Sequence, residues 1–320
     1  MRPTIPDLDG PEVGRRVAAL RPPKNPVDPR RPHAFFVEPE RSEQGVVEDT
    51  ATLFLVNREC PFRCLMCDLW RNTTDSRVQD GAVAAQVEYA LARLPAASHI
   101  KLYNAGNFFD ARAVPPGDLP RIAELVAPFR TVVVECHPRL VGPRSLDFRD
   151  RLRPALRVAM GLETAHPEVL RRLNKGMTLD DFAQAADFLR RNGVGVRAFL
   201  LLRPPFLDEA EGVEWAKQSL RYAFDVGVEC CVVIPTRDGN GAMELLRAQG
   251  EWAAPRLESL EHVLAYGVGL RRGRVFADLW DIEKLFQCPR CGPARARRLD
   301  AMNREQTLQP PVVCDCGGAA

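Results

Sequence analysis

Long hydrophobic runs are absent from this chain of 320 residues. No stretch approaches the roughly 18 consecutive apolar residues that a membrane-spanning helix needs, so we expect no membrane partner. The first residues, Met-Arg-Pro-Thr-Ile-Pro-Asp, lack the apolar core of a secretory signal peptide, and we expect a cytoplasmic protein. A large net charge is also missing. The formal net charge is +2, which by itself indicates no class of partner.

Cysteine, by contrast, is plentiful, with ten residues that fall mostly in close groups. Grouped cysteines in a cytoplasmic chain indicate metal binding rather than disulfides. Cys60, Cys64 and Cys67 have the spacing C-x3-C-x2-C, which random placement would give roughly 0.01 times per such chain. This spacing lets three thiolates hold three irons of a [4Fe–4S] cube and leaves the fourth iron open. The alternative is a zinc site or a buried cysteine cluster, although structural zinc usually takes two separated ligand pairs.

The middle of the chain alternates short apolar runs with longer amphipathic ones. The apolar runs, which predict strands, are residues 52–56, 100–103, 131–136, 156–162, 194–202 and 229–234. The amphipathic runs, which predict helices, are residues 82–94, 119–129, 143–152, 179–192 and 209–226. Six strand–helix repeats predict an α/β fold, an open (β/α)6 partial barrel with parallel strands.

Composition divides the chain into three segments. Residues 1–45 are rich in proline and lack periodicity, so we expect an extended arm. Residues 46–240 form the predicted barrel core. Residues 241–320 form a C-terminal extension with more helix, a strand at 274–279 and a cysteine-rich tail.

The cysteine motif begins just after the apolar run 52–56, at the edge of the predicted sheet where parallel α/β folds build their sites. In this context the motif resembles that of the radical S-adenosylmethionine (radical SAM) superfamily, whose partial barrel is TIM-like. The resemblance implies that Cys60, Cys64 and Cys67 ligate the cluster. It also implies that the methionine part of S-adenosylmethionine (SAM) chelates the fourth iron. An electron, from a donor such as flavodoxin or ferredoxin, would then cleave SAM to a 5′-deoxyadenosyl radical.

The ends of the second and third predicted strands carry candidate site residues. At Asn104, Ala105 and Gly106 the family usually has a Gly-Gly-Glu-like segment that binds the amino group of SAM. Here asparagine replaces the usual residue, so backbone carbonyls near Ala105 and Gly106 would take the contact, and a simple turn is the alternative. Glu135 and His137 are candidate substrate contacts or proton-transfer groups. Cys136 between them fits a buried small side chain better than a hydrogen-atom donor.

The next two strands end in Glu163 and Arg203. The family places a polar ribose contact at the position of Glu163, and the alternative is a carboxylate at a helix N-terminus. Arg203 stands where a cation would pair with a cofactor or substrate carboxylate, and an exposed loop arginine is equally consistent. Thr178 and Asp181 predict the capping box of the helix between these strands.

Several short sequence segments narrow the resemblance to one branch of the superfamily. They are Leu-Tyr-Asn-Ala-Gly-Asn-Phe-Phe-Asp, Val-Val-Val-Glu, Gly-Leu-Glu-Thr, Asn-Lys-Gly and Leu-Leu-Arg-Pro-Pro-Phe, in that order. They resemble the branch that holds the elongator catalytic subunit and the radical SAM subunit of archaeosine synthase. This implies an enzyme, a lyase or transferase, that acts on a modified nucleoside in tRNA or another nucleic acid. A free metabolite or natural product is the alternative substrate, and a non-catalytic iron–sulfur protein is a third hypothesis.

The tail carries two close cysteine pairs, Cys288/Cys291 and Cys314/Cys316. Four thiolates in two pairs predict a metal site, either structural Zn²⁺ or an auxiliary iron–sulfur cluster, with no metal as the third possibility. Arginine greatly outnumbers lysine in this chain. The clusters 271–274 and 295–298 would meet phosphates or form a solvated face.

Overall fold

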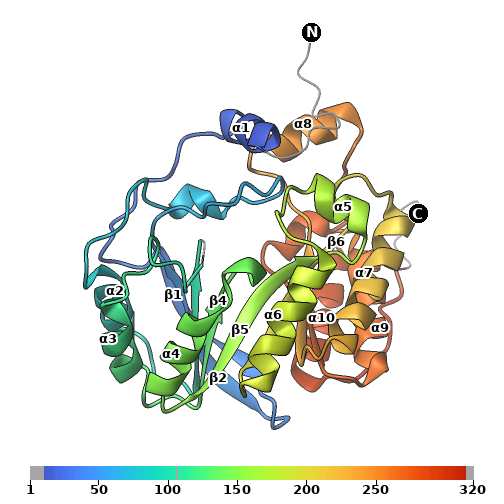
Figure 1. The fold of residues 1–320 in the computed structure, drawn as a ribbon. Helices are drawn as coiled ribbons and strands as arrows, with labels where there is room; N and C mark the ends of the chain where they lie inside the picture. Colours follow the sequence, from blue (N-terminus) through green and yellow to red (C-terminus); the bar gives the residue numbers. More distant parts are fainter. Residues whose placement is uncertain (1–10, 106, 315–320) are drawn as a thin grey trace.

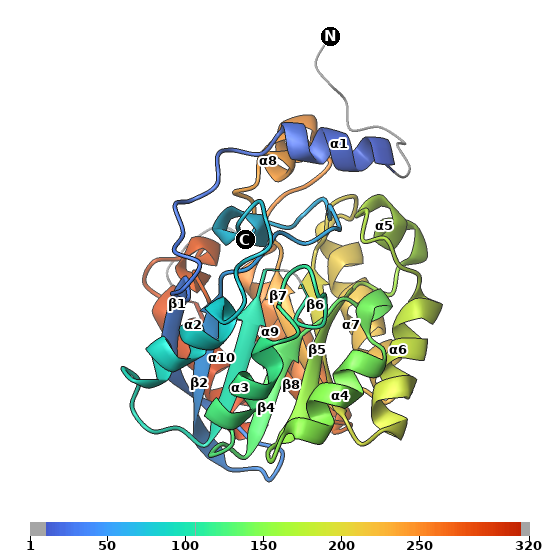
Figure 2. The ribbon, with the colours of Figure 1, turned by 60° about the vertical axis from the view of Figure 1, so that its left-hand side comes forward.

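One curled sheet of eight strands organises the computed structural model, which describes residues 11–105 and 107–314. The strands follow one another in chain order across the sheet, and Figures 1 and 2 show them curling into a half-barrel. They are β1 (Ala34–Arg41), β2 (Val47–Leu55), β3 (His99–Asn104), β4 (Thr131–Glu135), β5 (Ala155–Glu163), β6 (Gly195–Leu202), β7 (Cys230–Pro235) and β8 (Arg274–Ala277). Strand β1 is antiparallel to β2, and all other neighbours are parallel.

The predicted (β/α)6 core is confirmed as β2 to β7. Side chains such as those of Leu53, Val132 and Leu200 are fully buried, as expected for strands covered on both faces. The helices along the core are α2 (Ala82–Leu91), α3 (Asp118–Leu125), α4 (Pro143–Arg151), α5 (Pro167–Arg172), α6 (Leu179–Arg191) and α7 (Glu209–Asp225). Helix α6 begins with the predicted capping box, in which Thr178 Oγ1 accepts from the Asp181 amide at 3.1 Å.

The N-terminal segment contains regular structure that was not expected there. Helix α1 (Pro11–Ala19) and strand β1 lie within residues 1–45, for which the sequence predicted an extended arm. Pro39 lies inside β1, and proline argues against a central strand. The proline is tolerated because β1 is an edge strand with one unpaired side. The domain boundaries at residues 45 and 240 stay predictions.

Helix α1 lies over the mouth of the half-barrel, beside α8 (Ala242–Gln249), in both views (Figures 1 and 2). Val13 and Val17 of α1 pack with Met243 and Leu246 of α8 and with Leu65 of the cysteine loop. Burial of these apolar side chains therefore connects the first helix of the described chain to the loop that carries the cysteine motif.

Helix α10 (Gly292–Glu305) closes the open side of the sheet. It packs against both edge strands, β1 and β8, and against α9 (Leu257–Leu270). The Asn303 side chain bonds the backbone N and O of Ala277, and the Gln306 side chain does the same at Val275. These amides satisfy the free edge of β8, which would otherwise present unpaired polar groups.

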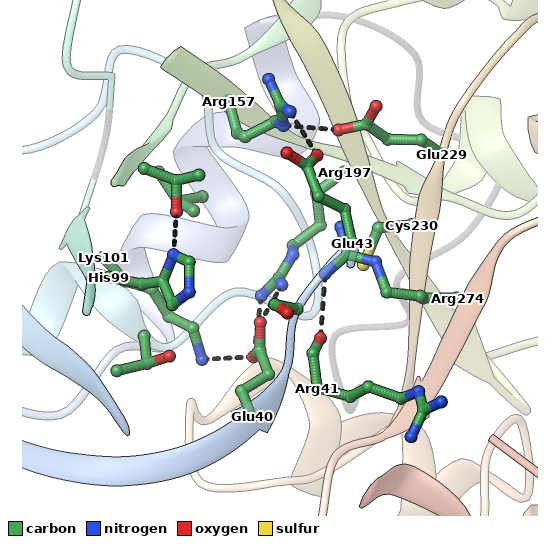
Figure 3. A pocket seen from close by; sticks show the side chains of 14 residues that line it. Glu40, Arg41, Glu43, His99, Lys101, Arg157, Arg197, Glu229, Cys230 and Arg274 are labelled. Carbon is green, nitrogen blue, oxygen red and sulfur yellow. Dashed lines mark hydrogen bonds and ion pairs between the residues drawn. The ribbon is translucent and has the colours of Figure 1, made fainter. Parts of the chain in front are cut away.

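A network of ion pairs fills the other end of the half-barrel, where the parallel strands begin (Figure 3). Lys101 Nζ lies 2.5 Å from Glu40 Oε2, and Arg197 pairs with the same carboxylate. Burial alone would raise the pKa of Glu40, but the charges of Arg197 and Lys101 hold it well below its usual range. The network closes the end of the barrel that lies opposite the cysteine loop.

Candidate functional site

The loop between β2 and the 3-10 helix η1 (Leu69–Asn72) carries Cys60, Cys64 and Cys67. Hydrogen bonds from distant segments fix its backbone. Asn240, which follows β7, donates to the carbonyls of Leu65 at 2.8 Å and of Cys67 at 3.2 Å. The Leu65 amide donates to the Leu173 carbonyl at 2.9 Å. The loop is therefore held by segments that follow β5 and β7, which keeps the thiols in place before any ligand binds.

A chain of contacts joins Cys60 to the ends of β4 and β5. Asn107 Nδ2 donates to Cys60 Sγ at 3.4 Å, and Asn107 Oδ1 accepts from the His137 amide. The His137 ring stacks on Phe62 with centroids 3.6 Å apart. His137 Nε2 is 2.9 Å from the Lys175 carbonyl, and Nδ1 accepts from the Arg139 amide. Since a carbonyl only accepts, Nε2 carries the proton, and both ring nitrogens are used in holding neighbouring loops.

His137 is thus a neutral, buried side chain. Burial lowers its pKa to about 3, and the nearby Lys175 charge acts in the same direction. The predicted role of His137 in proton transfer is not tested by this arrangement. The geometry assigns it contacts that position Phe62 and the segment around Lys175.

Glu163 and Lys175 form a buried ion pair at the end of β5. Lys175 Nζ donates to Glu163 Oε1 at 2.6 Å. Glu163 has φ +65° and follows a register shift against β6, so its backbone departs from the regular strand. The next helix, α5, has His166 as its N-cap, so Glu163 does not lie in the first turn of that helix.

Glu135 ends β4 beside Asn104, which ends β3. Glu135 Oε2 accepts from the Asn104 amide at 2.9 Å. Burial raises the pKa of Glu135 to about 7, against the opposing effects of this amide and of Lys175. Carboxyls with such a pKa are suited to proton transfer near neutral pH. The side-chain oxygen of Asn104 is buried without a hydrogen-bond partner, and Gly106 lies outside the described residues.

Arg203 follows β6 with φ +52° and has partners away from the other candidates. It pairs with Glu209 at 2.6 Å and donates to the Ala254 carbonyl at 2.9 Å. Among the hydrogen bonds and ion pairs of the described residues, none joins Arg203 to Glu135, Glu163 or the cysteine loop. The site therefore brings together Cys60, Asn104, Glu135, His137 and Glu163, with Arg203 beside the start of α7.

Comparisons with known proteins identify the family of this chain. The family model described as the radical SAM superfamily matches residues 54–214, about half of the chain. The chain belongs to the radical SAM superfamily. The archaeosine synthase β subunit of Thermococcus kodakarensis is 31% identical over 212 residues, which cover 63% of this chain and 65% of that protein. An uncharacterised protein of Methanocaldococcus jannaschii is 21% identical over 90% of this chain and 86% of its own length.

A solved structure shows the same fold. Methylornithine synthase superposes with a TM-score of 0.53 at 15% identity, covering 91% of this chain and 78% of that one. At this identity the likeness supports the partial TIM-like barrel and nothing about substrate. The predicted fold class is thereby confirmed, and this protein is a radical SAM enzyme.

Membership in the superfamily implies a [4Fe–4S] cluster and SAM. The described residues fit both. Three thiols lie on one fixed loop, and the unpartnered oxygen of Asn104 at the neighbouring strand end is available to a ligand. Burial raises the pKa of Cys64 to about 11, partly opposed by Lys175. Metal binding at such thiols releases protons, so iron and not the protein alone would stabilise the thiolates.

Four residues at the site were not assigned roles by the sequence: Phe62, Asn107, Lys175 and Asn240. The sequence did contain a hint that Lys175 has a specific role, because lysine is scarce in this arginine-rich chain and a glycine, Gly176, follows it. Gly176 has φ +71°, and a Cβ there would lie 3.1 Å from the Phe62 ring. Nothing in the sequence indicated the roles of Asn107 and Asn240, since their side chains form hydrogen bonds with groups far away in the sequence.

The C-terminal tail also changes one expectation. Three of the predicted metal ligands, Cys288, Cys291 and Cys314, lie together, with their sulfur atoms within 4.8 Å of one another. Cys316 lies outside the described residues. For the cluster 295–298 the sequence left phosphate contact and a solvated face open, and Arg295 and Arg298 instead have partners within the chain. Arg295 is buried against Glu258 and Glu261, and Arg298 holds the Gln309 and Pro310 carbonyls.

Two arginines of the cluster 271–274 also have partners within the chain. Arg272 pairs with Asp225 at 2.6 Å, and Arg274 donates to the Arg41 carbonyl at 3.0 Å. Arg271, Arg272 and Arg297 are exposed, in agreement with the solvated-face alternative. In the part of the chain that the structure describes, no helix is long and apolar enough to cross a membrane.

Proposed function

We propose that this radical SAM enzyme acts on a modified nucleoside in tRNA or another nucleic acid. The observation that carries the proposal is the 31% identity to an archaeosine synthase β subunit. The relative is matched over 65% of its length, so its substrate is carried over only as a class. When bound, the cluster and SAM supply the 5′-deoxyadenosyl radical, with an electron donor such as flavodoxin or ferredoxin.

The residues of this chain divide the remaining tasks. Cys60, Cys64 and Cys67 would hold three irons. Backbone groups near Asn104 would contact the methionine part of SAM, and Glu163 would accept from its ribose hydroxyls. Glu135, with its raised pKa, is suited to moving a proton at the substrate. Asn240 and Asn107 keep the loop and Cys60 in place.

An open cleft beside the cysteine loop offers a second observation that bears on the substrate. Its volume is about 450 Å³, and it lies between α1 and the loop. Its wall includes Arg15 and Arg63, with Phe62 and Gly176 nearby. Arg15 is exposed, and Arg63 also pairs with Glu59 at 2.6 Å. A phosphate-bearing substrate would find cations at this entrance.

The deciding experiment is nucleoside mass spectrometry of total tRNA from parent and deletion strains. We expect one modified nucleoside to disappear, or its precursor to accumulate, in the deletion strain. Wild-type protein should restore the profile. The variant with Cys60, Cys64 and Cys67 all replaced by alanine should not restore it. An unchanged tRNA profile in the deletion strain would reject tRNA as the substrate and favour another nucleic acid or a free metabolite.

A further inference from the structure

We propose that Cys288, Cys291 and Cys314 bind one structural zinc ion that fastens the start of α10. The three described cysteines come from two segments. Cys288 and Cys291 lie just before α10, and Cys314 lies after it. Their sulfur atoms all lie within 4.8 Å of one another. Three cysteines with a fourth ligand make a common structural zinc site, and Cys316, the next cysteine along the sequence, lies outside the described residues.

The spread of the sulfur atoms favours one metal ion over a cubane cluster. Tetrahedral zinc with bonds of about 2.3 Å puts its thiolates about 3.8 Å apart. Thiolates on separate irons of a cubane stand further apart, because two metal ions lie between them. The sulfur atoms of Cys288, Cys291 and Cys314, all within 4.8 Å of one another, therefore lie closer to the spacing around a single ion.

Hydrophobic burial does not explain why the chain returns to Cys288. Between residues 307 and 314 no described side chain is buried, and Leu308 and Val313 are 61% and 80% exposed. The contacts of this stretch are polar, chiefly the bonds from Arg298 to the Gln309 and Pro310 carbonyls. Such a segment is expected to open readily, whereas a zinc–thiolate site would supply the free energy that holds it.

The ion would act on the helix that closes the barrel. Cys291 is the N-cap of α10, and a Cβ at Gly292 would overlap the Phe286 ring, so this turn is tightly packed. The same helix contacts the edges of β1 and β8 and bonds the free edge of β8 through Asn303. Fixing the start of α10 therefore fixes the seam between the two edge strands.

The first test is elemental analysis of the full chain after anaerobic reconstitution of its iron. We expect about one zinc per chain together with about four irons. The Cys288→Ser/Cys314→Ser double variant should lose the zinc and keep the iron. Leu308→Ser, in the same exposed stretch, is the matched control and should keep both metals. About eight irons with no zinc, or no metal beyond four irons, would overturn the proposal.

The second test measures whether the zinc ion stabilises α10 and β8. Amide hydrogen exchange should accelerate in 292–305 and 274–277 when zinc is removed from the wild-type chain by a chelator, and recover when zinc is returned. The wild-type measurement stands even if the double variant fails to fold. Unchanged exchange on removal of a bound zinc would overturn the fastening role. Neither test depends on the nucleic-acid substrate, so the zinc proposal and the substrate proposal can be rejected independently of each other.

Discussion

Lys175 and Glu163 form a buried ion pair, with Nζ and Oε1 2.6 Å apart, beside the cysteine loop. Burial alone would lower the pKa of Lys175, but the Glu163 charge keeps it above its usual value, so the ammonium stays charged. The charge of Lys175 also acts on the thiols of Cys60 and Cys64. The pair therefore places a permanent cation next to the predicted iron site.

A cation near the cluster favours its reduced, more negative state. Lys175→Met should lower the cluster reduction potential by on the order of 60 mV, which for one electron corresponds to a tenfold change in the equilibrium constant. Spectroscopic redox titration of reconstituted protein measures the shift. Lys284→Met removes a lysine whose side chain is 70% exposed and should leave the potential unchanged. Equal potentials in wild type and Lys175→Met would show that Lys175 does not influence the cluster.

Gly161 makes room for the same pair. A Cβ at this position would overlap Glu163 Oε1 and lie 2.5 Å from Lys175 Nζ. Gly161→Ala should therefore displace the pair, and we expect SAM affinity to fall by on the order of tenfold through loss of the aligned Glu163 carboxylate. Gly117→Ala is the control, since nothing lies within 4 Å of its Cβ position. Wild-type SAM affinity in Gly161→Ala would contradict the ribose role predicted for Glu163.

The sequence predicted features that depend on neighbours along the chain. The cysteine loop after an apolar strand, the six core strands and the Thr178–Asp181 capping box all follow from short patterns, and the structure contains them. Strand β1 was missed because Pro39 argues against a strand unless its edge position is known. Whether a proline lies at an edge depends on the topology of the whole sheet.

Contacts between distant residues account for the other differences. Lys175 meets Glu163 only because β5 and the following loop fold back on each other. Arg295 was considered as a phosphate contact, yet its guanidinium lies against Glu258 and Glu261 of α9. A charge pattern gives the number of cations but not their partners, so the surface charge of such a chain depends on its fold.

Glu135 should make stability depend on pH in a specific direction. Burial raises its pKa from 4.5 to about 7. Between these values the folded protein holds the proton while the unfolded chain has lost it, so the free energy of unfolding falls as pH rises from 4.5 to 7. Glu135→Gln stays neutral and still offers an oxygen to the Asn104 amide. The variant should therefore gain stability relative to wild type as pH rises.

Urea unfolding at pH 5 and pH 7 measures this effect. Glu124→Gln is the matched control, because that carboxylate is on the surface of α3 with a side chain 68% exposed. It should follow the wild-type pH dependence. If Glu135→Gln also follows the wild type across this window, Glu135 does not bind its proton more tightly in the folded protein, and its assignment as a proton-transfer group near neutral pH loses its physical basis.

Loss of a single charge from the ion-pair network at the closed end of the barrel should be strongly destabilising. Glu40 neutralises both Lys101 and Arg197, whose side chains are 5% and 6% exposed (Figure 3). Glu40→Ala leaves two buried cations without this carboxylate and should lower the free energy of unfolding by about 3–5 kcal/mol. Glu88→Ala removes an exposed partner of Arg121 and should cost about 1 kcal/mol or less.

A triple variant separates unpaired charge from lost packing. Glu40→Leu, Lys101→Met and Arg197→Met together replace the three buried charged side chains with apolar ones of similar length. Glu38, the other partner of Lys101, has a side chain that is 41% exposed and stays in contact with water. This variant should recover most of the stability that Glu40→Ala loses, as measured by urea unfolding at pH 7. If the triple variant is instead as unstable as Glu40→Ala, shape and hydrogen bonding at this end of the barrel, and not charge balance, determine its stability.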